Sequence, residues 1–573
     1  MAETLVSPGV LATETDTSFV TQGPIQAGAA IIGPTVKGPV NIPTLVTSWS
    51  DYQNKFGTTL VSGGAIYSYF TSIAAYNYFS NGGNTLLVSR VVSGTYSPAT
   101  STTISGSSAA ATQPTFELKT LSEGAGQNSS SSIDSNGVLA SGSSDNIRWQ
   151  ISSVNTSSGT FTLLIRRGDD NTLNPVVLEQ WTNLSLDPFS PNYISKVIGD
   201  QTQTLRSDGN DYYLQTTGSY AGGSRYVRVS AVNNPTPNYL DSNGNITVAA
   251  YTSSLPIVAS GSFKSATGGI ATNAKFYDQI STTNTQGVSS SDYNDVINLL
   301  ANKDDYQYNV IMTPGLCDNL TGHSGVINTI ITNCQDRGDC IYIADMVSYG
   351  STTSTVVTQA ATKNTSYAAT YWPWVQVQDP NSGQNVWVPA STVIGGVYAY
   401  NDSVSEPWFA PAGINRGGLS TVIQAERKLP QSTRDTLYEG KVNPIATFPG
   451  QGVVVYGQKT LQTRASALDR VNVRRLLIAL KSYISQVANT LVFEQNSVAT
   501  RNNFLAQVNP YLENVQQRQG LYAFKVIMDD SNNTADVIDR NQLVGQIYVQ
   551  PTKTAEFIYL DFIVTPTGAS FPA

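Results

Sequence analysis

The end of the chain carries its most regular pattern of apolar and polar positions. Apolar residues with a four-then-three spacing predict an amphipathic helix over 470–493, and they are Val473, Leu477, Leu480, Ile484, Val487 and Leu491. A second helix is predicted over 497–520, interrupted at Pro510 because proline lacks a backbone donor. Strands are predicted at 523–529, 542–550 and 555–565. These elements predict an α+β domain over 456–573 that ends in a terminal arm.

The middle of the chain changes to a β-α-β pattern. Residues 308–313 and 340–345 are apolar runs, and the stretch 324–334 between them has helical spacing. This order predicts a parallel strand pair and an α/β layer. Nearer the N-terminus, the pattern predicts strands at 29–34 and 85–92 and helices at 50–57 and 63–80. We therefore assign 23–92 together with 266–455 to one middle α/β region.

Between these two parts of the middle region, the composition shifts toward Ser, Thr, Gly and Asn. Alternating stretches at 146–151 and 160–165 predict strands, and the Ser-rich stretch 127–144 is typical of a loop. We therefore predict that residues 93–265 form an inserted, outward-facing β-rich region. The predicted fold class is a multidomain α+β and α/β protein.

Both ends of the chain are predicted to be extended arms. In residues 1–22, Ser7, Pro8, Gly9 and Val10 disfavour helix, and the strand that follows has no partner nearby in sequence. At the other end, Ile558, Leu560, Phe562 and Val564 alternate with their neighbours as one face of a strand. A lone strand cannot satisfy its backbone donors and acceptors, so each arm is predicted to join the sheet of another subunit.

Charge and composition exclude several classes of partner. The net charge is −8 and the pI is about 4.9, which is not the charge of a nucleic-acid-binding protein. The sequence has no long Lys/Arg run that would favour an anionic membrane surface. It also has no apolar run of about 18 residues and no signal peptide at its start. We therefore expect neither nucleic-acid nor membrane binding, and a cytoplasmic origin.

The sequence shows little sign of catalytic, cofactor-binding or metal-binding motifs. The sequence contains no phosphate-binding glycine motif and no nucleophile elbow. Cys317, His323, Cys334 and Cys340 lie close in sequence, either as a zinc site or as small side chains in a β-α-β core, and their wide spacing favours the core. Four carboxylates cluster near the C-terminus, and they are Asp529, Asp530, Asp536 and Asp539. We interpret them as a solvated turn before a short helix that starts at Thr534, rather than as a Ca²⁺ loop. We predict no catalytic residue, no metal site and no cofactor, and hence no enzyme.

One basic stripe has two interpretations. Arg474, Arg475 and Lys481 lie on or beside one polar face of the helix predicted over 470–493. The stripe is either a solvated face or a surface that docks an acidic partner. Taken by itself, the stripe favours the solvated face.

Several segments together resemble a known family, the tail sheath proteins of contractile-tailed bacteriophages, most closely those with long single-chain subunits. The segments follow one another along nearly the whole chain, and they are Ser7–Val10, Ile31–Pro34 through Trp49, Tyr78–Gly83, Asn183–Pro188 through Asp200, Gly395–Ala399 with Asp402 and Trp408, Asn472–Leu476, Val492–Asn496 and Ala555–Phe557. The inserted region 93–265 is the main departure from shorter members of the family.

The resemblance implies a structural role. Such proteins form stacked hexameric rings around a tail tube, and contraction drives the tube through the host envelope for genome delivery. Implied partners are further copies of the chain, the tail tube protein, and baseplate and tail terminator proteins. The implied location is the virion tail, with assembly in the host cytoplasm. In this setting the stripe at Arg474, Arg475 and Lys481 becomes a candidate contact with the tube or another subunit.

Two other hypotheses remain at this point. The abundance of Ser, Thr, Gly and Asn would suit a secreted β-rich enzyme or adhesin, although no export signal or catalytic cluster accompanies it. A passive shell protein would also assemble, but without two distinct lattice forms.

Overall fold

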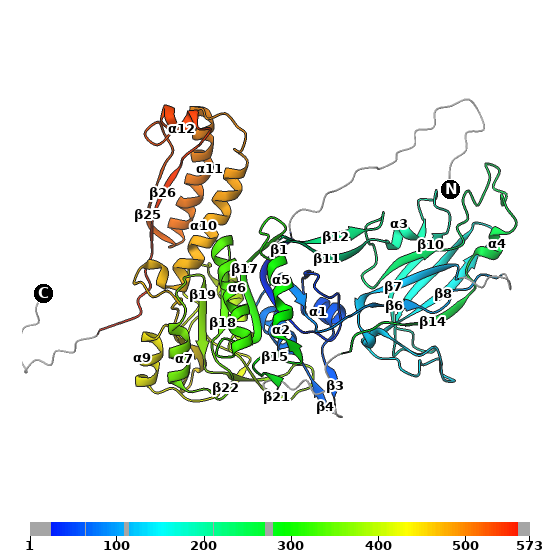
Figure 1. Cartoon of the computed structure of the whole chain (residues 1–573), viewed down its shortest axis with the longest axis horizontal. Helices are drawn as coiled ribbons and strands as arrows, with labels where there is room; N and C mark the ends of the chain where they lie inside the picture. Colours follow the sequence, from blue (N-terminus) through cyan, green and yellow to red (C-terminus); the bar gives the residue numbers. More distant parts are fainter. Residues whose placement is uncertain (1–24, 63–64, 108–113, 210, 270–278, 560–573) are drawn as a thin grey trace, which may run out of the picture.

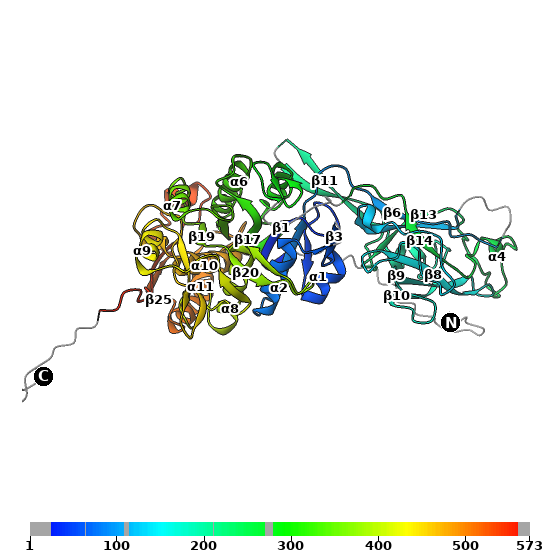
Figure 2. The ribbon, with the colours of Figure 1, turned by 90° about the horizontal axis from the view of Figure 1, so that it is seen from below.

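The computed structural model describes residues 25–62, 65–107, 114–209, 211–269 and 279–559. The molecule is elongated, with a β-rich part at one end, a large mixed sheet in the middle and a pair of long helices projecting from the other end (Figures 1 and 2). This arrangement confirms a mixed α/β fold of several parts. The predicted domain boundaries stay a prediction.

An eight-stranded sheet organises the middle of the molecule. Its strand order is β2-β5-β1-β17-β18-β19-β23-β24. The six central strands are parallel, and the two edge strands run antiparallel to their neighbours. The bounds are β1 Ile25–Gly33, β2 Thr44–Val46, β5 Leu86–Arg90, β17 Tyr306–Cys317, β18 Ile341–Asp345, β19 Ala368–Trp372, β23 Asn443–Phe448 and β24 Gly452–Val455. The β17–β18 pairing confirms the predicted parallel pair.

Helices cover both faces of this sheet, which is why its strands are apolar on both sides. In β1, Ala29 and Ile31 enter one core with helices α2 and α8, while Ala30 and Ile32 enter another with α5, α6, α7 and α9. The bounds are α2 Phe70–Ser80, α5 Tyr293–Leu299, α6 Thr321–Arg337, α7 Thr353–Ala361, α8 Ser391–Val404 and α9 Gln431–Glu439.

Helix α8 approaches its neighbours unusually closely. A Cβ at Gly395 would lie 2.3 Å from Sδ of Met312 in β17, and a Cβ at Gly396 would lie 2.7 Å from the Asn77 carbonyl oxygen in α2. The glycine pair therefore brings α8 against both the sheet and α2, where a larger residue would force them apart.

The β-rich part is a seven-stranded antiparallel sheet of order β10-β9-β8-β14-β6-β7-β13. Its strands are β6 Pro98–Ser101, β7 Phe116–Glu123, β8 Ile147–Asn155, β9 Thr160–Arg167, β10 Val177–Ser185, β13 Val227–Val232 and β14 Ala259–Lys264. A hairpin of β11 Thr202–Asp208 and β12 Asp211–Thr217 reaches back to the middle part, where Leu205 and Leu214 pack against its core. Helices α3 Ile194–Ile198 and α4 Tyr251–Ser254 complete this part.

The projecting part consists of α10 Val471–Asn489 and α11 Val498–Gln517, with β25 Leu521–Ile527, α12 Ala535–Asp539 and β26 Gln546–Pro551. Helix α11 continues through Pro510, so the predicted interruption is wrong. The lost backbone hydrogen bond is offset by tertiary packing, because Phe504, Val508, Leu512 and Val515 are all buried along α11.

Smaller elements complete the fold. They are α1 Trp49–Phe56, β3 Leu60–Ser62, β4 Ala65–Tyr67, β15 Asn284–Thr285, β16 Val288–Ser289, β20 Val375–Gln378, β21 Asn385–Val388, β22 Val422–Ala425 and 3₁₀ turns at 125–127, 290–292 and 467–469. The helix predicted over 63–80 begins only at Phe70, because β3 and β4 form a hairpin before it. The Gly63-Gly64 pair in the sequence is the signal for such a hairpin. Among the described helices, none has the length and apolarity needed to span a membrane.

Candidate assembly site

The two-stranded sheet of the projecting part is a candidate assembly site. Strands β25 and β26 pair antiparallel, and among the described residues neither has a second neighbouring strand. On one face Phe524, Val526 and Ile547 pack against the core of α10 and α11, while Tyr548 on the other face is 56% exposed. Each strand therefore offers unpaired backbone groups beside a ready-made apolar face, which is the usual template for an added strand.

The predicted arm residues fall largely outside the described part of the chain. Ser7, Pro8, Gly9 and Val10, and likewise Leu560, Phe562 and Val564, lie among residues that the structure does not describe. Ile558 is described and is 75% exposed. Of the strand predicted over 555–565, residues 555–559 adopt no strand within this single chain.

The basic stripe is not a surface stripe. Arg474 and Arg475 are each only 4% exposed, and they hold the start of α10 against the middle part. Arg475 pairs with Asp402 of α8 at 2.5 Å, and its guanidinium lies 4.7 Å from the Tyr398 ring. Arg474 donates to Ser366 Oγ. The expectation of an exposed docking face is therefore wrong for both arginines, and Lys481 alone is exposed, with its Nζ 3.3 Å from the Tyr367 hydroxyl.

The two arginines differ in electrostatics. Burial acts to lower the pKa of Arg475, but the charge and hydrogen bond of Asp402 outweigh it, so the pKa is raised. Burial lowers the pKa of Arg474, whose partners Ser366 and Tyr367 are neutral. Arg475 is thus a buried charge paired with a partly exposed carboxylate, whereas Arg474 depends on a hydroxyl and on the Tyr367 ring 4.0 Å away.

The cysteines and the histidine are buried in the middle part, with Cys317 in one core of the sheet and Cys334 and Cys340 in the other. Cys334 and Cys340 place their sulfur atoms 3.4 Å apart, and His323 Nδ1 accepts the Cys317 N–H at 3.1 Å. All three thiols are buried, and burial raises the pKa of Cys317. Within the described residues, no three His, Cys, Asp or Glu side chains form a metal-binding group. In the acidic cluster, Asp530 pairs with Arg501 at 2.8 Å.

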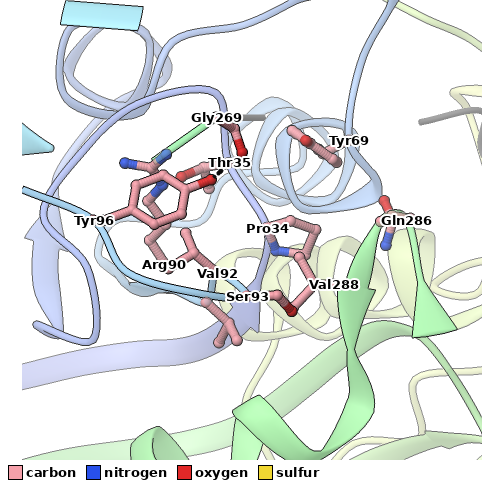
Figure 3. Close-up of a pocket in the computed structure, with 12 residues that line it drawn as sticks. Pro34, Thr35, Tyr69, Arg90, Val92, Ser93, Tyr96, Gly269, Gln286 and Val288 are labelled. Atoms are coloured by element: carbon pink, nitrogen blue, oxygen red, sulfur yellow. Dashed lines mark hydrogen bonds between the residues drawn. The ribbon is translucent and has the colours of Figure 1, made fainter. Parts of the chain in front are cut away.

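A buried arginine also joins the eight-stranded sheet to the β-rich part. Arg90, at the end of β5, is 1% exposed and donates from Nη1 to the carbonyl oxygens of Gly38 at 2.7 Å and Glu123 at 2.9 Å. It lies beside a cavity of about 80 Å³ that Tyr69 and Tyr96 also line (Figure 3). Among the described residues, no carboxylate oxygen is within ion-pair distance of it, so backbone carbonyls and the Tyr96 ring stabilise its charge.

Comparison with known proteins finds one family that matches the second half of the chain. Residues 286–461 match the domain family described as the "phage tail sheath protein central domain". Residues 463–565 match the one described as the "phage tail sheath C-terminal domain". Residues 286–565 of this chain are thus similar to two domains of the phage tail sheath family. That family is structural and is not a family of enzymes.

Curated relatives carry the same description. A tail sheath protein of Vibrio phage KVP40 is 44% identical over 208 residues, which are 36% of this chain and 31% of the relative. A tail sheath protein of Enterobacteria phage T4 is 40% identical over 193 residues, which are 34% of this chain and 29% of the relative. The matched segment thus spans about a third of each relative's length. A sheath tail protein from Listeria innocua shares the fold, with a TM-score of 0.52 at 10% identity over 92% of this chain and 95% of its own.

The contacts that join the sheath domains include residues that sequence reasoning missed. Asp402 and Glu556 belong to segments that carry the resemblance, yet nothing local identifies Asp402 as the partner of Arg475 or Glu556 as the acceptor for Tyr438. Arg90 is visible in the sequence only as a charge at the end of an apolar strand. A charge inside an otherwise apolar run is the one available signal, because such a charge is costly unless it is partnered.

Proposed function

We propose that this chain is the structural subunit of a contractile phage tail sheath. It polymerises as stacked hexameric rings around the tail tube, and its contraction drives the tube through the host envelope for genome delivery. The observation that carries the proposal is the presence of both sheath domains, in order, over residues 286–565. The open β25–β26 sheet in the second of these domains supports it.

Strand addition is the proposed link between subunits. The alternation of Ile558, Leu560, Phe562 and Val564 would extend the apolar face that β25 and β26 already present to α10 and α11. The N-terminal arm of 22 residues can reach about 70 Å when extended, at roughly 3.3 Å for each residue. Two arms of this kind can keep subunits joined while their folded parts slide and turn.

The proposed energy source is the assembly itself. The extended sheath is a kinetically trapped state, and a better-packed contracted state releases it. Assembly takes place in the host cytoplasm, and the finished sheath is part of the virion tail. Its partners are further copies of the chain, the tail tube protein, and baseplate and tail terminator proteins.

Electron microscopy of negatively stained protein tests the proposal. The full-length chain is expected to form long hollow tubes, and a chain without residues 1–22 is expected to lose them. A chain without 557–573 should lose them as well. Circular dichroism of both truncated chains establishes that they remain folded. The matched control is a chain in which only residues 1–6 are removed, so that Ser7–Val10 are kept.

Each outcome separates the hypotheses. Tubes in two lattice forms, lost on truncation, support a sheath joined by strand exchange. Particles of one invariant lattice indicate a passive shell. Monomers from every folded chain refute the proposal.

A further inference from the structure

The segment that follows β26 crosses from the projecting part to the middle part of the molecule. Thr552 is hydrogen-bonded to the turn before β25. Its N–H donates to the Gly520 carbonyl oxygen at 3.1 Å, and its Oγ1 donates to the Gln519 carbonyl oxygen at 2.7 Å. Two residues later, Thr554 Oγ1 accepts from Gln458 Nε2 at 2.6 Å. After β26 the chain thus runs away from α12 and toward α9 (Figure 1).

A single carboxylate then fixes the chain to the middle part. Glu556 Oε1 accepts from Arg470 Nε at 2.7 Å and from Gln458 Nε2 at 3.0 Å, and its Oε2 accepts from the Tyr438 hydroxyl at 2.7 Å. These donors come from three separate places, namely α9, the segment after β24 and the residue before α10. Burial acts against the charge, but these hydrogen bonds outweigh it and lower the pKa of Glu556.

The donors are themselves held in place. Lys459 Nζ donates to the Tyr438 carbonyl oxygen at 2.8 Å and lies 4.2 Å from the Tyr438 ring. Arg470 also pairs with Asp469 at 3.0 Å. The carboxylate therefore enters a pre-arranged set of donors, and hydrogen bonds to a charged group in such a setting are the strong kind.

Directly after this anchor the chain exposes three large apolar side chains. Phe557 is 68% exposed, Ile558 is 75% exposed and Tyr559 is 92% exposed. The change from an anchored carboxylate to exposed apolar residues takes place within one residue. Glu556 is thus the last point at which the described chain is tied to its own subunit.

We propose that Glu556 is a positioning residue that directs the C-terminal arm to a second copy of this chain. To pair with its own β25 or β26, the arm would have to turn back at once along the segment 552–556, and the anchor at Glu556 fixes that segment pointing toward α9. The anchor therefore disfavours closure within one subunit and leaves the arm free to add to the sheet of a neighbour. This inference rests on the proposed function, because it assumes that the arm is donated.

The test compares Glu556→Ala, Glu556→Gln and the control Glu439→Gln, which changes an exposed carboxylate next to Tyr438. Hydrogen exchange is measured on dilute full-length protein before tubes form. Peptides covering 552–556 should exchange about tenfold faster or more in Glu556→Ala, since the hydrogen bonds to the charged group are lost. Glu556→Gln should be intermediate because its amide keeps one acceptor oxygen, and Glu439→Gln should match the original chain.

Tube formation is the second measurement. Glu556→Ala is expected to shorten or abolish the tubes while the melting temperature of the folded parts stays unchanged. If Glu556 had a purely structural role, its removal would lower that melting temperature. Tubes of normal length from Glu556→Ala, or unchanged exchange over 552–556, would overturn the inference. If the original chain itself forms no tubes, the proposed function fails together with the arm donation, while the exchange data still decide whether Glu556 anchors the segment.

Discussion

The ion pair between Arg475 and Asp402 predicts an asymmetry between two substitutions. Arg475 is 4% exposed, whereas the Asp402 side chain is 35% exposed. Removing Asp402 leaves a buried guanidinium without a counter-charge, and its Nη1 already has no hydrogen-bond partner among the described residues. Removing Arg475 leaves a carboxylate that water can reach. Asp402→Ala should therefore destabilise the junction of α10 and α8 more than Arg475→Met does.

The magnitudes follow from these environments. Breaking a buried pair so that a charge is left behind costs about 3–5 kcal/mol, and we assign that range to Asp402→Ala. Arg475→Met keeps most of the apolar packing and frees a partly hydrated carboxylate, so we expect about 1–2 kcal/mol. Asp402 lies in the last turn of α8, where the helix dipole disfavours a carboxylate. Asp402→Ala removes this unfavourable interaction, which offsets only about 0.5 kcal/mol of the lost stability.

Hydrogen exchange of peptides from α10 is the appropriate measurement, because a multidomain chain does not unfold in one step. Asp402→Ala should accelerate exchange over 471–489 by about 10² or more, and Arg475→Met by about tenfold. Asp402→Asn is the control that keeps an acceptor oxygen and should fall between them. If Arg475→Met proves the more damaging change, the assignment of the buried charge to Arg475 is refuted.

Three further predictions concern buried polar groups. Arg90→Met should loosen the joint between β5 and β7, destabilising it by about 2–3 kcal/mol, and small-angle scattering should show a wider spread of shapes; an unchanged profile and stability would contradict this. Burial raises the pKa of Asp345 to about 7, so the folded chain holds a proton that the unfolded chain releases near pH 4, and stability falls as pH rises from about 4 to 7. Asp345→Asn should remove that fall, so that the variant gains at most about 4 kcal/mol of stability relative to the original chain by pH 7. If the stabilities of the two chains change in parallel across this pH range, the prediction is contradicted. The buried thiols of Cys317, Cys334 and Cys340 should resist a thiol reagent in the folded chain and react after unfolding, with rapid native labelling as the contrary result.

Local periodicity was sufficient for much of the fold. The spacing of Val473, Leu480 and Val487 places one helix within a few residues of α10, and the β-α-β order gives the parallel β17–β18 pair. These signals are local because a helix or strand shows its buried face through residues only a few positions apart. Where the sequence went wrong, at 63–80 and at Pro510, turn chemistry or tertiary packing outweighed the local preference.

The sequence by itself thus determined the elements, the mixed α/β class and the ordered segments that resemble sheath proteins. Only the tertiary structure decided the roles of its charged side chains. Arg474 and Arg475 look like a solvated stripe, yet their partners stand 108 and 73 residues away in the chain. Glu556 likewise meets donors 86 to 118 residues away. A charge on a helix face is hydrated or buried according to what packs against it, and that neighbour is set by the fold rather than by adjacent residues.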